Sequence, residues 1–126
     1  MSPIRRNHPD LAPPAGPYSH MVRHGDTLYT SGFTAFGTGA ETGDICAQAR
    51  AVFAQLGALA EDQGSSLAHL VKVTVFVTEL DQVGALRDTL FEIYGENIPA
   101  SSLIRVAGLF APQLKIEVEA VFACPG

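Results

Sequence analysis

The sequence predicts an α+β domain in which two helices cover one face of a mixed β-sheet. Two kinds of periodicity support this prediction: two stretches repeat apolar residues at helical spacing, and others alternate apolar with polar residues, as a half-buried strand does. Along the chain the expected order is strand, strand, helix, strand, helix, strand, strand. Because connections between successive elements are short, both helices most simply pack on the same side of the sheet.

The length and composition indicate one folded domain with an apolar surface. At 126 residues the chain has the length of a single domain, which we expect over 1–126, with an extended lead-in over 1–15 and a tail over 123–126. Only 17% of the residues are charged, against about 25% in a typical soluble protein. The 47% of apolar residues excludes a disordered chain.

Charge and cysteine usage exclude several classes of function. The net charge is -5 and the basic residues are scattered, which argues against a nucleic-acid partner. No apolar run reaches the roughly 20 residues of a membrane span, and the N-terminus lacks the apolar core of a signal peptide, so we expect a cytoplasmic protein without a membrane partner. Cys46 and Cys124 lie far apart and outside any Cys/His cluster, so neither a metal site nor a disulfide is expected.

The first expected element is a β-hairpin, followed by a loop. Residues 18–23 and 27–31 are the expected strands, and they flank His24-Gly25-Asp26, whose Gly-Asp pair suits a tight turn. Residues 32–43 are rich in Gly, Thr and Ala and have no period, which indicates a loop.

The first helix is the strongest element of the sequence. Asp44 is its expected N-cap and Gly64 its expected end. Its apolar residues fall at 4-3-4-3 spacing on one stripe: Ile45, Ala49, Val52, Leu56 and Leu59.

A strand and the second helix follow. Valines at 71, 73, 75 and 77 alternate with Lys72, Thr74 and Phe76, which predicts a strand with one deeply buried face. The helix is predicted from a 3-4-3 spacing, with Asp81 or Thr78 as its cap and Gly95 with Pro99 at its end. Its apolar stripe consists of Val83, Leu86, Leu90 and Ile93.

Residues 101–107 and 114–122 are expected to be the last two strands. Leu114, Ile116, Val118, Ala120 and Phe122 share one face of the final strand. The sheet face away from the helices should carry Phe76, Thr74, Val121 and Leu103 beside Lys72 and Glu117, while Ser102 and Ile104 face the helices. That face is too apolar for free solvation, so we expect a closed homo-oligomer to bury it.

Six motifs in this chain resemble those of the Rid family, also called YjgF/YER057c/UK114. They occur in the family's order over about residues 16–122: Gly16-Pro17-Tyr18-Ser19-His20, Tyr29-Thr30-Ser31-Gly32, Ala47-Gln48-Ala49-Arg50, Val71-Lys72-Val73-Thr74-Val75-Phe76-Val77, Ile98-Pro99-Ala100-Ser101-Ser102 and Lys115-Ile116-Glu117-Val118-Glu119-Ala120. The resemblance implies a chorismate-mutase-like fold in a homotrimer with a central barrel and three sites in the clefts between subunits. It also implies hydrolysis of enamines and imines, or of a related small conjugated acid, to a keto acid and ammonia, without a cofactor or metal.

The resemblance also assigns site residues. Tyr18 and Glu117 match the family's tyrosine and its water-directing glutamate, Ser31 and Gly32 match its Ser-Gly pair, and Phe33 follows them. Ser101 stands where the family's carboxylate-binding arginine would be, which places this chain in an arginine-less subgroup. The loss removes a charge-assisted contact worth about 1.5–3 kcal/mol and argues against efficient deamination of 2-aminoacrylate.

Arg87 occupies the position of the family's pocket asparagine. We hypothesise that it supplies the missing anion grip, against the alternative of an exposed arginine paired with Asp88 or Glu92. Arg105 lies about 13 Å along the strand from Ser101 and cannot simply replace the arginine.

Other site residues also keep two interpretations. Backbone groups near Ser31-Gly32 and Leu103 would polarise the electrophile. Periodicity alone places Glu117 on a solvated face of mixed charge, whereas its family position places it in a pocket. His20 and His24 are structural residues or proton donors to a leaving amine.

Two functions remain open at this point. The first is a cofactor-independent hydrolytic deaminase, and the second is a non-catalytic trimer that binds small metabolites or a protein in the same clefts. An endoribonuclease is the weakest alternative, because the chain is acidic and lacks a basic aromatic groove.

Overall fold

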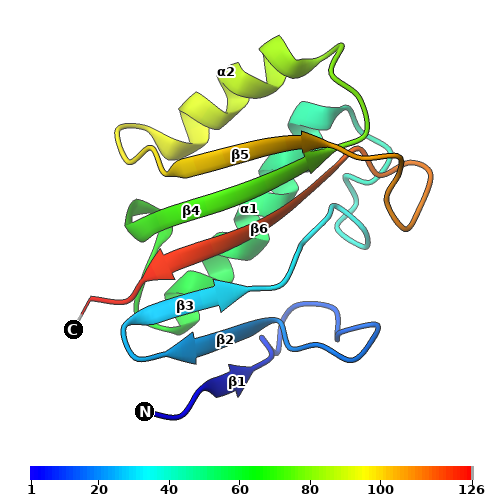
Figure 1. Cartoon of the computed structure of the whole chain (residues 1–126). Helices are drawn as coiled ribbons and strands as arrows, with labels where there is room; N and C mark the ends of the chain where they lie inside the picture. Colours follow the sequence, from blue (N-terminus) through cyan, green and yellow to red (C-terminus); the bar gives the residue numbers. More distant parts are fainter. Residues whose placement is uncertain (126) are drawn as a thin grey trace.

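A computed structural model, which describes residues 1–125, has six strands in one mixed sheet and two α-helices on the same side of it (Figure 1). The elements are β1 (Ile4–Arg6), β2 (Met21–His24), β3 (Thr27–Thr30), α1 (Ile45–Asp62), the 3-10 turn η1 (Leu67–His69), β4 (Leu70–Val77), α2 (Val83–Tyr94), β5 (Ala100–Arg105) and β6 (Ile116–Ala123). The strand order is β1-β2-β3-β6-β4-β5, and β4 and β5 are the parallel pair. The predicted α+β class and the placement of both helices on one face are confirmed.

Helix α1 confirms the strongest prediction of the sequence. The Asp44 carboxylate caps it by accepting a hydrogen bond of 2.8 Å from the Ala47 N–H, and Gly64 follows its end with φ +72°. The predicted stripe forms the centre of the core, with every member at most 5% exposed: Ile45, Ala49, Val52, Leu56 and Leu59. Helix α2 packs beside α1, and the rings of Phe53 and Tyr94 meet edge to face with centroids 5.5 Å apart.

Within the described residues, no helix is both long and apolar enough to cross a membrane.

The first hairpin forms as predicted, with shorter strands. Gly25 has φ +64° at the turn between β2 and β3, the conformation for which glycine was expected there. The lead-in is not merely extended, because residues 4–6 pair with β2 as an additional edge strand. The expected tail also differs: β6 continues to Ala123 and Cys124 is buried, while Gly126 lies outside the described residues.

Two details of β4 and α2 were predicted wrongly. Val71 is half exposed because the register with β6 shifts between Leu70 and Lys72, and Leu70 takes the buried place instead. Helix α2 begins after Gln82, whose side chain makes no capping hydrogen bond, so neither Asp81 nor Thr78 is the cap. Its predicted end is confirmed by Gly95, which has φ +60°.

Strand β5 presents the opposite faces from those predicted. In the parallel pair, Ser101 and Leu103 stand beside the buried Val73 and Val75, so their side chains point to the helix side of the sheet. Ile104 stands beside Phe76 on the uncovered face. Lys72 Nζ donates a hydrogen bond of 2.8 Å to Ser102 Oγ on that same face. The expected burial of alternate β6 residues is confirmed, from Leu114 to Phe122.

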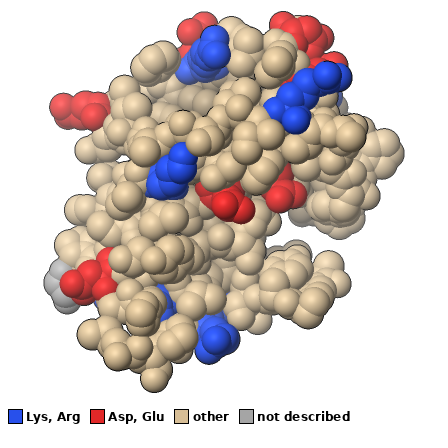
Figure 2. Space-filling model, in the orientation of Figure 1, with Lys and Arg blue, Asp and Glu red and all other residues tan. Residues whose placement is uncertain are grey.

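The sheet face away from the helices is sparsely charged, as the composition indicated. Figure 2 looks onto this face and shows broad areas without Lys, Arg, Asp or Glu. It carries half-exposed apolar residues, including Tyr29 and Ile104, beside Lys72 and Glu119. An apolar surface of this kind is suited to burial against another molecule.

A buried glutamine connects α1 to the two long loops of the fold. The Gln48 side chain is fully buried, and its amide nitrogen donates to the carbonyl oxygens of Glu41 (3.2 Å), Gly43 (3.1 Å) and Gln113 (2.9 Å). Its Oε1 accepts a hydrogen bond of 2.8 Å from the Lys115 N–H. The loop before α1 and the loop before β6 are therefore held together through one side chain.

Replacing Gln48 with alanine should lower the free energy of unfolding by about 2–4 kcal/mol, because three carbonyls and one N–H lose their hydrogen bond to its side chain. Urea denaturation followed by circular dichroism measures this loss. Gln82→Ala is the matched control, since that side chain is exposed and caps nothing, and it should change the free energy by less than about 0.5 kcal/mol. Equal effects of the two substitutions would contradict the role given to Gln48.

Candidate functional site

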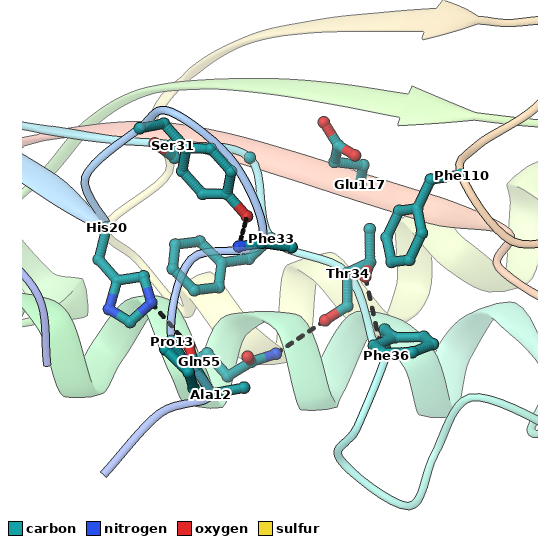
Figure 3. Close-up of a pocket in the computed structure, with 13 residues that line it drawn as sticks. Ala12, Pro13, His20, Ser31, Phe33, Thr34, Phe36, Gln55, Phe110 and Glu117 are labelled. Carbon is teal, nitrogen blue, oxygen red and sulfur yellow. Dashed lines mark hydrogen bonds between the residues drawn. The ribbon is translucent and has the colours of Figure 1, made fainter. Parts of the chain in front are cut away.

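A pocket of about 500 Å³ opens where the chain leaves β3, between the lead-in, α1 and β6 (Figure 3). Its walls include five of the site residues predicted from the sequence: Tyr18, Ser31, Gly32, Phe33 and Glu117. These come from the segment before β2, from the end of β3 and from β6, and the fold brings them together. Among the described residues, no group of three or more His, Cys, Asp or Glu side chains is placed to hold a metal ion.

Glu117 lies directly against the backbone of Gly32. A Cβ atom added at Gly32 would stand 2.8 Å from Glu117 Cδ, closer than real Cβ contacts, and 3.1 Å from its Cγ, which is tighter than most. Only glycine leaves room there for the carboxylate, and the chain pairs again with β6 directly afterwards, where Phe33 and Val118 exchange hydrogen bonds of 2.9 and 3.0 Å. The close approach explains why a glycine follows Ser31.

The environment of Glu117 raises the pKa of its carboxyl group. Burial is the main cause, and repulsion from the Glu119 carboxylate adds to it. Within residues 1–125, the Glu117 carboxylate makes no hydrogen bond or ion pair with another side chain. A half-buried carboxylate that is not neutralised by a cation is a stronger base than an ordinary carboxylate, and it can accept a proton from water and return it.

The hydroxyl groups of Tyr18 and Ser31 are engaged differently. Ser31 donates its hydroxyl hydrogen to the Ser19 carbonyl at 2.6 Å, which ties the segment before β2 to the end of β3. Tyr18 accepts a hydrogen bond of 3.2 Å from the Ala15 N–H, so its own O–H remains available as a donor. Half of the Tyr18 side chain is exposed, which leaves its ring at the border of the pocket.

His20 is a structural residue of the pocket wall. Its Nδ1 accepts a hydrogen bond of 2.9 Å from the His8 N–H, and its Nε2 lies 2.9 Å from the Ala12 carbonyl, to which it donates. Both ring nitrogens are thus used to fasten the lead-in, and the ring packs at 5.5 Å against Phe33. The ring nitrogen of His24 instead contacts the Met1 carbonyl, outside the pocket.

Three predicted site residues lie elsewhere in the chain. Arg87 is exposed on α2, and Glu92, one partner considered for it, pairs with Arg50 at 2.6 Å. Ser101 and Leu103 point to the helix side of β5, whereas Glu117 belongs to the uncovered face, so the two groups project from opposite sides of the sheet. The pocket of one chain therefore contains a carboxylate and none of the residues considered for an anion grip.

The pocket residues that the sequence analysis missed include two phenylalanines and a glutamine. Phe36 and Phe110 lie in loops without periodicity, and Gln55 lies beside the apolar stripe of α1, where a polar residue draws no notice. The Gln55 amide nitrogen donates to the carbonyls of Thr34 (2.9 Å) and Ala51 (3.2 Å). The only sequence signal for this part of the pocket was a phenylalanine in each of two loops. These two residues indicate a pocket wall only when the structure shows that the loops lie side by side (Figure 3).

Comparison with known proteins supports the resemblance. Residues 9–124 match the family model described as Endoribonuclease L-PSP. A 2-iminobutanoate/2-iminopropanoate deaminase of Dermatophagoides farinae is 33% identical over 125 residues, covering 96% of this chain and 97% of that protein. A RutC family protein of Pasteurella multocida is 38% identical over 121 residues, which cover 90% of this chain and 93% of that protein. A Thermotoga maritima protein of known structure is 35% identical with a TM-score of 0.86, and the match covers 98% of this chain and 99% of that protein.

Glu117→Gln should stabilise the folded protein at pH 7. Because folding raises the pKa of Glu117, the native state binds its proton more tightly than the unfolded chain, and ionisation costs stability above the ordinary carboxyl pKa of 4.5. The substitution removes that cost, and the gain should shrink as the pH is lowered through the raised pKa toward 4.5 and vanish below it. Urea denaturation across this pH range measures the difference.

The control for that experiment is Glu96→Gln, which removes an exposed carboxylate outside the pocket. It should leave the free energy of unfolding nearly unchanged at every pH. A gain for Glu117→Gln that grew toward acid pH would show that the pKa shift has the opposite sign.

Proposed function

The chain belongs to the Rid family, which includes the YjgF and RutC proteins, and on this premise we propose that it hydrolyses imines, and enamines through their imine tautomers, in the Glu117 pocket. The observation that supports this most directly is the half-buried carboxylate of Glu117, held against Gly32 with a raised pKa and no neutralising cation in the pocket. The name of the Dermatophagoides farinae relative gives the same class of reaction.

The reaction needs little more than a positioned base and a water-poor site. Glu117 takes a proton from a water molecule, whose oxygen forms a bond to the imine carbon, and passes this proton to the imine nitrogen, which gives a carbinolamine. Glu117 then takes the hydroxyl proton of the carbinolamine and gives it to the amine as the C–N bond breaks, so one imine and one water give one ketone or keto acid and one ammonia. The Tyr18 O–H can hold the substrate by a hydrogen bond.

A second copy of the chain would complete the site. Arg87, Ser101 and Leu103 lie on or near α2 and β5, at one edge of the sheet, away from the pocket of their own chain. We propose that the protein forms a homotrimer in which this edge of one chain faces the Glu117 pocket of the next. Such an arrangement, with the uncovered sheet faces turned inward as a central barrel, would also bury the sparsely charged surface described above.

Two other functions have less support. The family model is described as an endoribonuclease, but the described pocket walls carry neither Lys nor Arg, and the chain has a net charge of -5, so a phosphate backbone lacks binding partners. A non-catalytic trimer that binds a small metabolite or a protein would use the same pocket without needing the raised pKa of Glu117.

Substitutions of Glu117 and Gly32 test the proposed reaction. An amino-acid oxidase acting on alanine generates iminopropanoate, and the rate of ammonia release with and without the protein measures catalysis. Glu117→Gln should lower kcat/KM by about 10²-fold or more, because the general base is lost. Gly32→Ala should lower it by up to about 10²-fold, because the new Cβ displaces the carboxylate.

The matched control is Gly84→Ala. Gly84 lies in α2, a Cβ there would meet nothing within 4 Å, and alanine favours the helix, so activity should be retained. If the unmodified protein accelerated the decay of no imine but still bound small keto acids, the hydrolase would be rejected in favour of the binding trimer.

Arg87→Ala tests the second half of the site. If Arg87 of a neighbouring copy holds the substrate carboxylate, the substitution should raise KM for iminopropanoate by roughly ten- to hundredfold, with a smaller effect on kcat. Arg6→Ala removes an exposed arginine from β1 and serves as the control. Unchanged kinetics for Arg87→Ala would remove this residue from the site.

A further inference from the structure

Two phenylalanine rings form one wall of the pocket and remain exposed there. Phe36 and Phe110 are 53% and 68% exposed, and their rings meet edge to face with centroids 5.1 Å apart. They belong to different loops, one before α1 and one before β6, and in Figure 3 they lie on the same side of the pocket, with Phe110 nearer to Glu117 and Phe36 below it. Exposed aromatic rings gathered at the mouth of a pocket favour a ligand that covers them.

The loop that carries Phe36 is held firmly on both sides of this residue. The Thr34 carbonyl accepts from Gln55, and the Phe36 N–H donates to Thr34 Oγ at 3.2 Å. Ala35 is fully buried, and Thr38 donates to its carbonyl through both its N–H (3.1 Å) and its hydroxyl (2.6 Å). The Phe36 ring is therefore presented by a fixed backbone, as a recognition surface requires.

The loop before β6, which carries Phe110, is anchored as well. Phe110 precedes Gln113, whose carbonyl accepts from the buried Gln48 amide, and the Leu114 N–H donates to the Ala111 carbonyl at 3.1 Å. Gln48 also binds the carbonyls of Glu41 and Gly43 in the first loop. One buried side chain thus connects the loop that carries Phe36 to the loop that carries Phe110.

The size and lining of the pocket match a ligand larger than a three-carbon imine. A volume of about 500 Å³ lies within the range of about 300–1,000 Å³ that pockets for drug-sized ligands occupy. Phe33 and the half-exposed ring of Tyr18 add further aromatic surface near the carboxylate of Glu117. A small substrate would leave most of this surface in contact with water.

We propose that the pocket selects imines that carry an aromatic substituent, which it places against the rings of Phe36 and Phe110. The inference rests on the proposed function for the reaction, and on these two rings for the preference. The C=N bond then lies toward Glu117, and the aromatic group covers the edge-to-face pair at the mouth. Small aliphatic imines react in the same pocket with weaker binding.

A pair of substrates that differ only in the side chain tests this preference. An amino-acid oxidase converts phenylalanine and alanine to their imines, which carry the same carboxylate and the same C=N group. The unmodified protein should show a kcat/KM at least about tenfold higher for the aromatic imine. Phe36→Ala and Phe110→Ala should each lower that ratio severalfold, and the double variant by about tenfold or more, mainly through KM for the aromatic imine.

Ile4→Ala is the control variant. It removes an exposed apolar side chain from β1, away from the pocket walls, and should leave the ratio unchanged. A thermal melt of each variant checks that the fold is intact. The same ratio in the unmodified protein and in the double variant would overturn the proposal.

Binding separates this proposal from the proposed reaction. NMR titration with phenylpyruvate and with pyruvate, the two keto-acid products, measures the preference without catalysis, and phenylpyruvate should bind at least about tenfold more tightly. If no imine is hydrolysed but this preference holds and is lost in the double variant, the reaction is wrong and the aromatic selectivity stands. If the variants change only the oligomeric state in sedimentation, the rings are a contact between chains and the selectivity is wrong.

Discussion

The buried amide of Gln48 is the interaction on which the pocket depends. It extends from the first turns of α1 to carbonyls of the loop before that helix and of the loop before β6, and its oxygen accepts from Lys115. These hydrogen bonds join the two loops to each other. The loop that carries Phe36 is also held to α1 by Gln55 and to β6 by the pairing of Phe33 with Val118. A polar group is retained in the core here because every hydrogen-bonding atom of its amide is satisfied.

The contact between Gly32 and Glu117 shows how a carboxylate with a raised pKa is accommodated in this setting. The backbone of Gly32 removes space for water on one side, and burial is the main reason for the raised pKa of Glu117. A side chain larger than hydrogen at position 32 would fill the space that the carboxylate occupies. The same burial that makes Glu117 a better base costs the folded protein stability, which is a common feature of functional sites.

The parts of the fold that could be predicted are those in which one buried face produces a periodic pattern of apolar residues in the sequence. Helix α1 and strand β6 each pack one face on the core, and their apolar positions show it. The face that β5 turns to the core could not be predicted in this way. Its neighbouring residues Leu103 and Ile104 are both apolar and point to opposite faces, so only the register of β5 with β4 decides which of them faces the helices. In the pocket, motif resemblance located the carboxylate and its glycine. The aromatic wall of Phe36 and Phe110 and its support by Gln55 depend on long-range packing of aperiodic loops, for which a local pattern carries no signal.

The absence of a cationic side chain beside Glu117 within the described residues of one chain affects the basicity of its carboxylate. A guanidinium beside Glu117 would lower the pKa of its carboxyl and weaken it as a base, and no arginine lines the described pocket. Arg87 and Ser101 instead lie at the edge formed by α2 and β5. If a neighbouring copy brings Arg87 to the pocket, the guanidinium must bind the carboxylate end of the substrate and stay at least the length of that substrate away from Glu117.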